Sequence, residues 1–287
     1  MPVSEPLAMV TGAAGAIGGG VASMLRSKGY RVIAVDIDDA AAARAVDAIG
    51  GDTIGVPCDA GDRDAVRTLA DRIRGEWADR LEVLVCNAGL IVPGPIGTFD
   101  PAVLSTQVDV MLSCPIQLMN AAVPGMRARG RGRLLATVSM GGIISLPGSA
   151  TYSAAKSGLR AFLTALSAEL AGSGVRVSGV YPSGVDTPML RFEARHGGSL
   201  LNFVGKVFTV PEVVAAYEKA LTGKRLEVYL PYSDSITTRV ANVVPGTANR
   251  IIPLFERFAR RGHARFLARI EAEDARPAAV PEAPESR

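Results

Sequence analysis

The chain has 287 residues, of which 48% are hydrophobic and 21% are charged, and its 31 basic and 28 acidic side chains give a formal net charge of +3. This length and composition are typical of a globular protein with one large domain or two small ones, and they exclude collagen-like, low-complexity and wholly disordered chains. The three cysteines form no CxxC pair and are too few for a disulfide scaffold, so we expect a reducing, cytoplasmic compartment.

Targeting, membrane-spanning and nucleic-acid-binding segments are not expected from this sequence. The apolar run at 7–10 follows no Lys or Arg, which does not fit a signal peptide, and no stretch approaches eighteen apolar residues. The segment from Arg239 to Arg269 holds seven arginines and one acid, a charge of +6, which leaves −3 for the rest of the chain. A nucleic-acid-binding domain would instead spread its basic residues over the folded surface.

In chain order, short apolar runs alternate with longer segments of helical periodicity. Strands are predicted at 6–10, 31–35, 53–56, 81–86, 132–138, 175–181 and 226–230. Helices are predicted to end near 28, to span 40–49, 62–77, 151–170 and 211–221, and to begin at Asp100-Pro101, an N-cap followed by proline. Strands without polar alternation are buried on both faces, and helices between them imply parallel pairing with right-handed crossovers. The pattern predicts an α/β fold, a doubly wound parallel sheet with helices on both faces.

The chain continues beyond the last predicted strand with a basic amphipathic pattern. Apolar side chains recur at helical spacing, with arginines on the other side: Ile251, Leu254, Phe255 and Phe258 against Arg250, Arg257, Arg260 and Arg261. We expect a helical extension over 236–270, which packs on its own domain or on a neighbouring subunit; peripheral contact with an anionic membrane is the alternative. Residues 271–287, rich in Pro, Ala and Glu, are expected to be disordered.

A glycine-rich turn, Thr11 to Gly18, follows the first strand and precedes a helix. Small residues let a pyrophosphate approach the backbone, and the amide groups at the start of the next helix bind the anion. An ordinary strand–helix loop is the alternative interpretation, but the position of the turn favours dinucleotide binding. The second strand ends at Asp36, whose carboxylate could accept both ribose hydroxyls and would repel a 2′-phosphate. No Arg or Lys stands at 13, 14 or 37, so we expect NAD rather than NADP.

Tyr152 and Lys156 are four residues apart on a predicted helix and therefore share one face. An ammonium group and a cationic nicotinamide would lower the tyrosine pKa from its ordinary value near ~10, so the phenol could exchange a proton with a substrate oxygen. Ser139 ends the preceding strand, at the edge where parallel sheets gather their sites, and could hold the reacting carbonyl. A loop-capping serine is the alternative for Ser139.

These motifs stand in an order and spacing that resembles the short-chain dehydrogenase/reductase family over roughly residues 6 to 230. They are TGxxx(A/G)xG at Thr11 to Gly18, Asn87-Ala88-Gly89, Ser139, Tyr152-x-x-x-Lys156, and Pro182 through Thr187-Pro188. The resemblance implies an NAD(P)-dependent oxidoreductase on a single Rossmann-like domain, residues 1–235, that forms a homodimer or homotetramer built partly on the Tyr152 helix.

The resemblance also implies roles for individual residues. Tyr152 would be the general acid/base, Lys156 would hold the nicotinamide ribose and lower the tyrosine pKa, and Ser139 would orient the substrate oxygen. Asp59 would touch the adenine, and Val185 and Thr187 would meet the nicotinamide carboxamide. The implied cofactor-binding residues are Thr11, Gly12, Gly15, Ala16, Ile17, Gly18, Asp36, Asp59, Asn87, Ala88, Gly89, Tyr152, Lys156, Pro182, Val185 and Thr187.

Three positions depart from the family pattern. Met111 stands where the family usually has an Asn that supports a water-linked proton relay, and Ser183 replaces the usual Gly after Pro182. Cys86 replaces an Asn before Asn87, and we interpret it as a buried apolar residue. Met111 alone supports a second hypothesis, a non-catalytic nucleotide-binding scaffold or sensor that kept the fold.

Substrate identity is expected to depend on an apolar segment after Thr187, at 188–210, bordered by 90–92 and 143–144. An apolar cleft there would suit a hydrophobic secondary alcohol or ketone, such as a sterol, terpenoid or acyl chain. The alternative is that most of these side chains are core. The two histidines have no ligand spacing with cysteines or acids, so no metal is expected.

Overall fold

The computed structural model describes residues 5–243 and 245–275, except for the side chains of 237 and 240–251. Its centre is a parallel sheet of seven strands in the order β3-β2-β1-β4-β5-β6-β7. The strands are β1 (Leu7–Thr11), β2 (Arg31–Asp36), β3 (Ile54–Pro57), β4 (Leu81–Cys86), β5 (Gly132–Thr137), β6 (Val175–Pro182) and β7 (Glu227–Leu230). The strand order reverses between β1 and β4, which is where ligands bind in doubly wound sheets.

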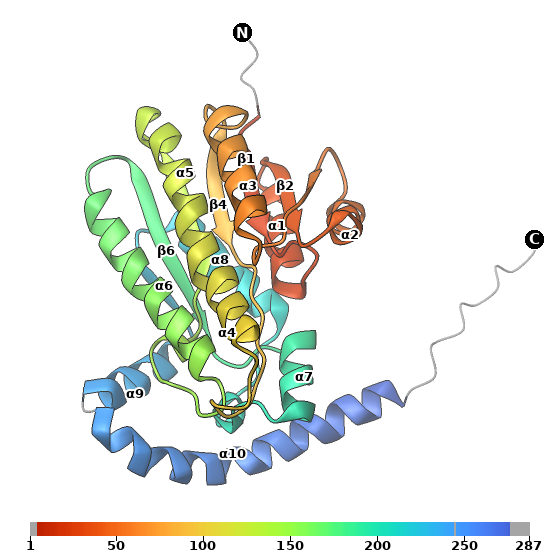
Figure 1. The fold of residues 1–287 in the computed structure, drawn as a ribbon, viewed down its shortest axis with the longest axis vertical. Helices are drawn as coiled ribbons and strands as arrows, with labels where there is room; N and C mark the ends of the chain where they lie inside the picture. Colours follow the sequence, from red (N-terminus) through yellow and green to blue (C-terminus); the bar gives the residue numbers. More distant parts are fainter. Residues whose placement is uncertain (1–4, 244, 276–287) are drawn as a thin grey trace, which may run out of the picture.

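Helices cover both faces of the sheet, as predicted (Figure 1). One face carries α1 (Ala16–Ser27), α2 (Asp39–Ile49) and α8 (Val210–Thr222), and the other carries α3 (Arg63–Gly75) and α6 (Ala150–Glu169). Alternate residues of β1 face opposite cores: Leu7 and Met9 pack with α3, whereas Ala8 and Val10 pack with α1. Burial on both faces explains why the strands show no polar alternation. The Rossmann-like α/β fold predicted from the sequence is confirmed.

A long helical run covers the α3 face beside α6. It comprises α4 (Pro101–Val108), a π-helical turn η1 (Asp109–Ser113) and α5 (Cys114–Ala128). Asp100 caps it as expected, because its carboxylate accepts the amide of Ala102 at 2.7 Å. By length and composition this is the one described helical run that could cross a membrane, a property that buried core helices share. Its side chains Leu118, Met119 and Met126 are buried in the core of the sandwich.

The expected substrate loop contains regular structure. It holds helix α7 (Pro188–His196) and a 3-10 turn η3 (Leu200–Phe203) before α8 begins. The expected extension is helical, as predicted, but it is two helices, α9 (Tyr232–Val243) and α10 (Pro245–Asp274). In Figure 1, α10 runs past α7 along one end of the molecule. The helix continues to Asp274, so the expectation of disorder from residue 271 is wrong for 271–274; residues 276–287 lie outside the described part.

Helix α10 is attached to α7 and η3 by apolar packing and ion pairs. Phe266 and Ile270 form a small core with residues of α7 and η3. Arg269 pairs with Asp186 at 2.8 Å, and Glu273 pairs with Arg191 at 2.8 Å. These contacts make α10 part of the same folded unit as the sheet.

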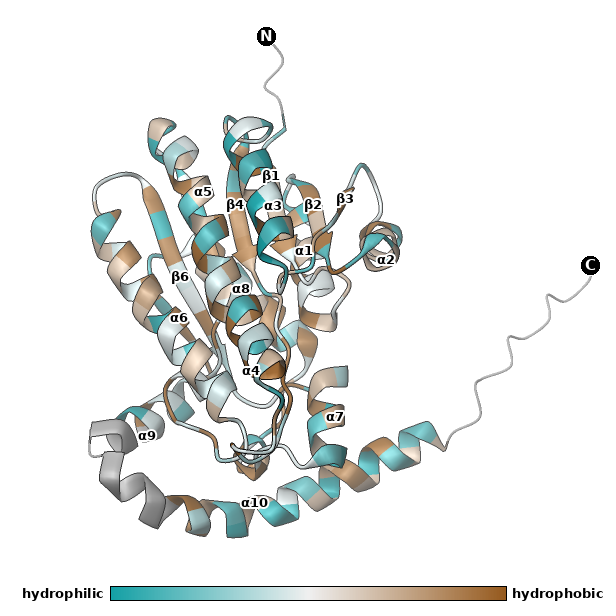
Figure 2. Cartoon of the chain, viewed as in Figure 1, coloured by the Kyte–Doolittle hydropathy of each residue, from teal (hydrophilic) through white to brown (hydrophobic). Residues whose placement is uncertain are grey.

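The expected apolar side of the extension is not a single buried stripe. Leu254 and Phe258 are 55% and 63% exposed, and they share the outward side of α10 with exposed arginines. Phe255 instead lines a cavity, and Ala259 is buried. The side chains of Arg250 and Ile251 lie outside the described residues. Figure 2 shows the resulting alternation of hydrophilic and hydrophobic segments along α10. The predicted helix is confirmed; within the single chain Leu254 and Phe258 are not covered, and packing of this side on a neighbouring subunit stays a prediction.

Candidate active site

The glycine-rich turn closes tightly after β1. A Cβ on Gly18 would lie 2.0 Å from the carbonyl oxygen of Gly12, so a larger residue cannot take its place. Gly12 has a φ of +66°, a left-handed conformation that favours glycine. Gly15 precedes α1 without a side-chain cap, which leaves the amides of residues 16–18 at the helix start without intrahelical partners. The turn therefore offers the close approach and the amide donors that a pyrophosphate requires.

The segment after β4 is hydrogen-bonded to this turn. The hydroxyl of Thr11 accepts the amides of Asn87 and Ala88, both at 3.0 Å. The Asn87 side chain donates to the carbonyls of Thr11 at 3.2 Å and Gly12 at 3.3 Å, and its Oδ1 accepts the hydroxyl of Thr137 at 2.8 Å. Asn87 thus ties together the ends of β1, β4 and β5. Gly89 follows Ala88, and a Cβ built on Gly89 would lie 3.8 Å from the side chain of Met111.

Two carboxylates lie at the same edge of the sheet. Asp36 ends β2, and its Oδ2 accepts the amide of Ala14 in the turn at 2.8 Å, while its Oδ1 accepts the amide of Ile37 at 2.8 Å. Asp59 follows β3, is exposed, and accepts the amide of Gly61 at 2.8 Å. Backbone amides therefore fix a negative charge directly beside the phosphate-binding turn.

Ser139 lies just beyond β5 in a conformation that is unusual for serine. Its φ is 114°, and it is the one non-glycine residue with positive φ among those described. Such a conformation costs about 1–3 kcal/mol and persists where the surroundings impose it, typically at functional sites. Its Oγ accepts the amide of Gly141 at 3.1 Å, the capping contact expected as the alternative, and it also shares a hydrogen bond with Tyr152. Ser139 is both a cap and a neighbour of the phenol.

Tyr152 lies in the first turn of α6 with its ring against Gly141, where an added Cβ would come 3.0 Å from a ring carbon. Burial raises the pKa of Tyr152 to about 12, and the negative charge of Glu193 acts in the same direction, while the hydrogen bond with Ser139 lowers it. The direction differs from the sequence expectation, because desolvation outweighs the other influences within the protein. The chain by itself therefore holds Tyr152 as a neutral phenol.

Lys156 lies one turn further along α6 and is only 4% exposed. Its Nζ donates to the carbonyl of Thr137 at 2.7 Å and lies 5.8 Å from the centre of the Tyr152 ring. Burial lowers the pKa of Lys156 to about 8, so the amine is still mainly protonated at neutral pH. The structure brings Ser139, Tyr152 and Lys156 together where β5 ends and α6 begins.

The residues expected on the nicotinamide side follow β6. Pro182 is the last residue of that strand, Val185 pairs with Phe208 as an isolated bridge, and Thr187 caps α7 by accepting the amide of Leu190 at 3.3 Å. All of the predicted site residues thus lie at the carboxyl ends of strands or in the turns and helix starts that follow them. Among the residues that the structure describes, no group of His, Cys, Asp or Glu is arranged to hold a metal ion.

The three departures from the family pattern have structural explanations. Met111 is fully buried in the π-helical turn and packs with Ala155 and Tyr152. Cys86 is buried, and burial raises the pKa of its thiol to about 12, which is consistent with an apolar role. Ser183 has a new partner, because its Oγ donates to Asp234 of α9 at 2.8 Å.

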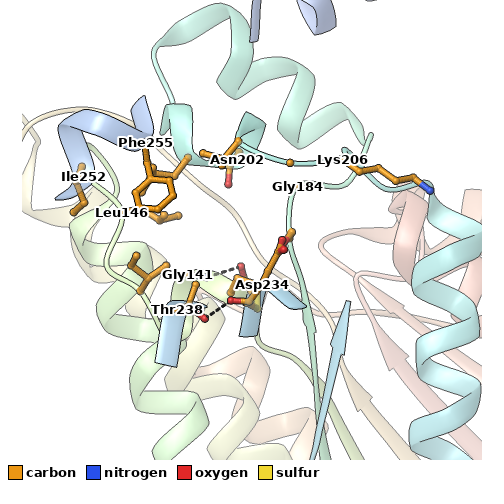
Figure 3. Close-up of a pocket in the computed structure, with 16 residues that line it drawn as sticks. Gly141, Leu146, Gly184, Asn202, Lys206, Asp234, Thr238, Ile252 and Phe255 are labelled. Atoms are coloured by element: carbon orange, nitrogen blue, oxygen red, sulfur yellow. Dashed lines mark hydrogen bonds between the residues drawn. The ribbon is translucent and has the colours of Figure 1, made fainter. Parts of the chain in front are cut away.

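A cavity of about 200 Å³ opens next to Ser139 (Figure 3). Its wall is largely apolar and comes from four parts of the chain: the loop after β5, the loop after β6, η3 with the residues that follow it, and the two C-terminal helices. The lining residues are Ser139, Met140, Gly141, Ile144, Leu146, Ser183, Gly184, Leu201, Asn202, Val204, Gly205, Lys206, Asp234, Thr238, Ile252 and Phe255. We call the side of the cavity formed by η3, α9 and α10, with α7 packed behind it, the C-terminal wall.

Sequence reasoning identified the lining of this cavity only in part. Leu201, Val204 and Ile144 line the cavity as expected, whereas Leu190 and Phe203 are core, and Met189 and Phe192 are exposed. It missed the contributions of α9 and α10, since no motif marks them. It also missed a carboxyl buried behind the wall, that of Glu193 on α7, which is 6% exposed and accepts the side-chain amide of Asn202 at 3.2 Å. Burial raises the pKa of Glu193 to about 7.

Comparison with known proteins gives consistent relatives. The sequence model of the family described as short chain dehydrogenase matches residues 6–196. Cis-4-hydroxycyclohexanecarboxylate dehydrogenase of Sinomonas cyclohexanicum is 34% identical over 190 residues, which are 65% of this chain and 76% of the relative. 1-Deoxy-11-beta-hydroxypentalenate dehydrogenase of Streptomyces avermitilis is 34% identical over 197 residues, 67% of this chain and 73% of the relative.

A solved structure of a metagenomic short-chain oxidoreductase in complex with NADP superposes with a TM-score of 0.65 at 28% identity, covering 78% of this chain and 96% of that chain. The family match extends over more than half of the sequence. The chain belongs to the short-chain dehydrogenase/reductase family.

Proposed function

We propose that the chain is an NAD-dependent oxidoreductase that interconverts a hydrophobic secondary alcohol and its ketone. The observation that carries this proposal is that Ser139 and Gly141 line the apolar cavity, and the Tyr152 ring packs against Gly141. A substrate carbonyl in the cavity would then meet the Ser139 hydroxyl, with Tyr152 packed behind Gly141 of the same lining. The two named relatives are dehydrogenases of hydroxylated compounds, which supports an alcohol or ketone substrate class.

The residues present fit a nicotinamide dinucleotide. The close contact at Gly18, the amides at the start of α1 and the fixed carboxylate of Asp36 would hold the pyrophosphate and the adenosine ribose. When bound, the nicotinamide supplies or accepts the hydride of the reaction. Asp36 supports NAD, because a carboxylate there would repel a 2′-phosphate, although two structural neighbours are complexes with NADP or NADPH.

The proton side of the reaction belongs to Tyr152. In reduction the neutral phenol gives its proton to the carbonyl oxygen, which takes up the C=O π electron pair as the carbonyl carbon gains the hydride; in oxidation the phenolate takes the proton of the hydroxyl. Ser139 donates a hydrogen bond to the same oxygen and orients it toward Tyr152. Lys156, held by the carbonyl of Thr137, has its ammonium 5.8 Å from the centre of the Tyr152 ring, and its positive charge would favour the phenolate.

The alternative is a nucleotide-binding scaffold without turnover, which the buried Met111 favours. Lys156 already has a backbone partner in Thr137, so the set of Ser139, Tyr152 and Lys156 is positioned without an Asn at 111. We therefore favour the enzyme. We also propose a cytoplasmic location, which the three buried, unpaired cysteines support, and a homodimer or homotetramer, which is typical of the family.

Replacement of Tyr152 by Phe tests the enzymatic proposal. Turnover of hydrophobic secondary alcohols should fall by at least about 10²-fold because the proton-transfer group is lost, while cofactor binding measured by calorimetry stays within about twofold. Steady-state kinetics with NAD and NADP, on a panel of steroid, terpene and aliphatic alcohols, gives both the substrate class and the cofactor preference. Retained turnover in the variant would refute the role of Tyr152, and a higher kcat/KM with NADP would refute the NAD assignment.

Peripheral membrane contact is a second candidate role, and the exposed Leu254 and Phe258 favour it. They share the outward side of α10 with exposed arginines, a composition that suits an anionic lipid surface. The role then predicts pelleting with phosphatidylserine-containing vesicles that falls several-fold in the Leu254→Ser/Phe258→Ser double variant and in high salt. Equal pelleting of both proteins would leave α10 as a packing element of its own domain, the role that we favour.

A further inference from the structure

A fully buried tyrosine takes no part in the proposed proton transfer. Tyr217 lies on α8 and packs in the core that also contains Leu135 of β5 and Val180 of β6. Its hydroxyl shares a hydrogen bond with the Oγ of Thr137, the last residue of β5. Burial raises the pKa of Tyr217 well above its ordinary value, so the phenol keeps its proton near neutral pH. Because a buried hydroxyl without a hydrogen bond costs free energy, the contact with Thr137 is what makes a tyrosine acceptable at this position.

Thr137 is the residue at which two parts of the candidate site meet. Its carbonyl accepts the ammonium of Lys156 at 2.7 Å, and its hydroxyl donates to Oδ1 of Asn87 at 2.8 Å. Asn87 in turn donates from Nδ2 to two carbonyls of the glycine-rich turn, those of Thr11 at 3.2 Å and Gly12 at 3.3 Å. Thr137 therefore contacts both the buried lysine and the residue that ties β4 to the turn.

The donors and acceptors of these hydrogen bonds follow from the protons available. Because Nδ2 of Asn87 faces two carbonyl oxygens, the atom that faces Thr137 is Oδ1, which can only accept. A threonine hydroxyl has one proton, and Thr137 uses it in this bond, so its Oγ accepts from Tyr217. The result is one directed chain, in which Tyr217 donates to Thr137, Thr137 donates to Asn87, and Asn87 donates to the turn. Each hydrogen bond in such a buried chain polarises and strengthens the next.

We propose that Tyr217 is a positioning residue for the glycine-rich turn, acting through Thr137 on Asn87. Its hydroxyl directs the Thr137 proton to Asn87 and thereby fixes the side-chain amide that anchors the turn to the end of β4. Tyr217 lies outside the 6–196 span of the family match, so this support for the turn comes from a later part of the chain. The consequence for ligand binding rests on the proposed function, since it takes the turn to be the dinucleotide site.

The expected consequence is weaker cofactor binding with unchanged chemistry. Without the Tyr217 hydroxyl, the Oγ of Thr137 loses its donor, and its bond to Asn87 weakens. The contact with Lys156 instead uses the backbone carbonyl of Thr137, a residue that is held in register with Val180 by the pairing of β5 with β6. KM for the cofactor should therefore rise in a variant without this hydroxyl, while kcat at saturating cofactor stays within about twofold.

A double-mutant cycle, measured by calorimetry with NAD and with NADP, tests the proposal. Tyr217→Phe keeps the ring and removes the hydroxyl, so the dissociation constant of the cofactor should rise about fivefold, the change expected for one neutral hydrogen bond. Thr137→Val keeps the side-chain shape but removes the link, and in that background Tyr217→Phe should change the dissociation constant by less than about twofold. Thr137→Ser keeps the link, and there Tyr217→Phe should again cost about fivefold. An equal effect in all three backgrounds, or none in the wild type, would overturn the proposal.

Tyr181→Phe is the matched control for the loss of a buried hydroxyl. Tyr181 is also buried, but it donates to Glu227 at 3.2 Å and has no printed link to the turn or to Thr137 in the described part of the chain. Its variant should bind the cofactor as the wild type does, within about twofold. A loss of affinity as large as that in Tyr217→Phe would mean that any buried hydroxyl supports the site through general packing, which contradicts a specific role for Tyr217.

Hydrogen exchange in the cofactor-free protein gives a readout that requires neither turnover nor ligand. The amides of Asn87 and Ala88 donate to the Thr11 hydroxyl at 3.0 Å, so they report how firmly the turn is anchored. Their exchange should be several-fold faster in Tyr217→Phe than in Tyr181→Phe, and equal rates would refute the positioning role. A wild type that binds a dinucleotide but turns over no alcohol or ketone would refute the oxidoreductase, while the cycle and the exchange rates still decide the role of Tyr217. A wild type that binds neither dinucleotide would refute the proposed function, and the exchange rates alone would decide the role of Tyr217.

Discussion

The glycine-rich turn and the C-terminal wall both belong to the candidate active site, yet they are assembled differently. The turn is local: Gly12 and Gly18 belong to one short segment, and a Cβ on Gly18 would lie 2.0 Å from the carbonyl oxygen of Gly12. The wall is non-local: a Cβ on Gly262 of α10 would lie 2.2 Å from the carbonyl of Phe203 in η3. Both regions depend on a glycine at a close contact, but only the turn has a recognisable sequence motif.

The two regions also differ in what holds them. Thr11 and Asn87 fix the turn by hydrogen bonds between adjacent strand ends. The wall depends on a small apolar core around Phe266 and on partly exposed ion pairs such as Arg269–Asp186, each worth about 0–1 kcal/mol. We therefore expect the turn to be rigid and specific for one class of ligand. We expect the packing of the wall to change with pH and with substitution, and the affinity for substrate to change with it.

The largest expected effect comes from Gly18→Ala in the turn. The added methyl would collide with the Gly12 carbonyl, so the turn and the start of α1 must move apart, and cofactor affinity should fall by at least about 10²-fold. Calorimetry with NAD measures this loss. Gly75→Ala at the end of α3 is the matched control, because nothing lies within 4 Å of a Cβ there; it should bind cofactor normally and be stabilised by about 0.5–1 kcal/mol. Unchanged affinity in Gly18→Ala would contradict the rigid-turn interpretation.

The same contrast explains what could be predicted from the sequence. The strands and the turn were predictable, because each lies in a local pattern whose physics is fixed by short-range geometry. The placement of Asp36, Ser139, Tyr152 and Lys156 at one edge of the sheet followed from the order of the family motifs, and their roles stay predictions. The Asp234–Ser183 pair joins residues 51 apart and follows from where α9 packs, which no local pattern specifies. The environment of α10 could not be predicted for the same reason: periodicity predicts an amphipathic helix but not which neighbours will cover it.

Glu193 provides the second test, since its burial makes the wall sensitive to pH. The pKa of Glu193 rises from its ordinary 4.5 to about 7 in the folded protein, so the folded state keeps its proton where the unfolded state has lost it. This group then destabilises the fold progressively as pH rises from about 4.5 to 7, by up to about 3 kcal/mol. Glu193→Gln should remove that loss, so the variant should gain stability over wild type at pH 8 but not at pH 4.5.

Urea unfolding of wild type and Glu193→Gln at both pH values measures the difference. Glu169→Gln, at an exposed position at the end of α6, is the control and should show no pH-dependent difference from wild type. Cofactor affinity should be the same in all three proteins, which confines the effect to the wall. A stability difference between wild type and Glu193→Gln that does not grow with pH would mean that the carboxyl ionises freely in the folded state.

The smallest expected effect, about tenfold in KM, comes from Gly262→Ala, the counterpart of the turn variant. Its methyl would meet the Phe203 carbonyl, and α10 must shift away from η3, which moves the lining residues Leu201 and Phe255 that these two elements carry. Because the substitution changes the packing of α10 on η3 and leaves the turn, Ser139 and Tyr152 unaltered in sequence, KM for the alcohol should rise while cofactor affinity and kcat stay within about twofold. Ala264→Val on the exposed side of α10 is the control. If kcat and cofactor affinity fell together with the loss of substrate affinity, the two regions would be coupled and the distinction drawn between them would fail.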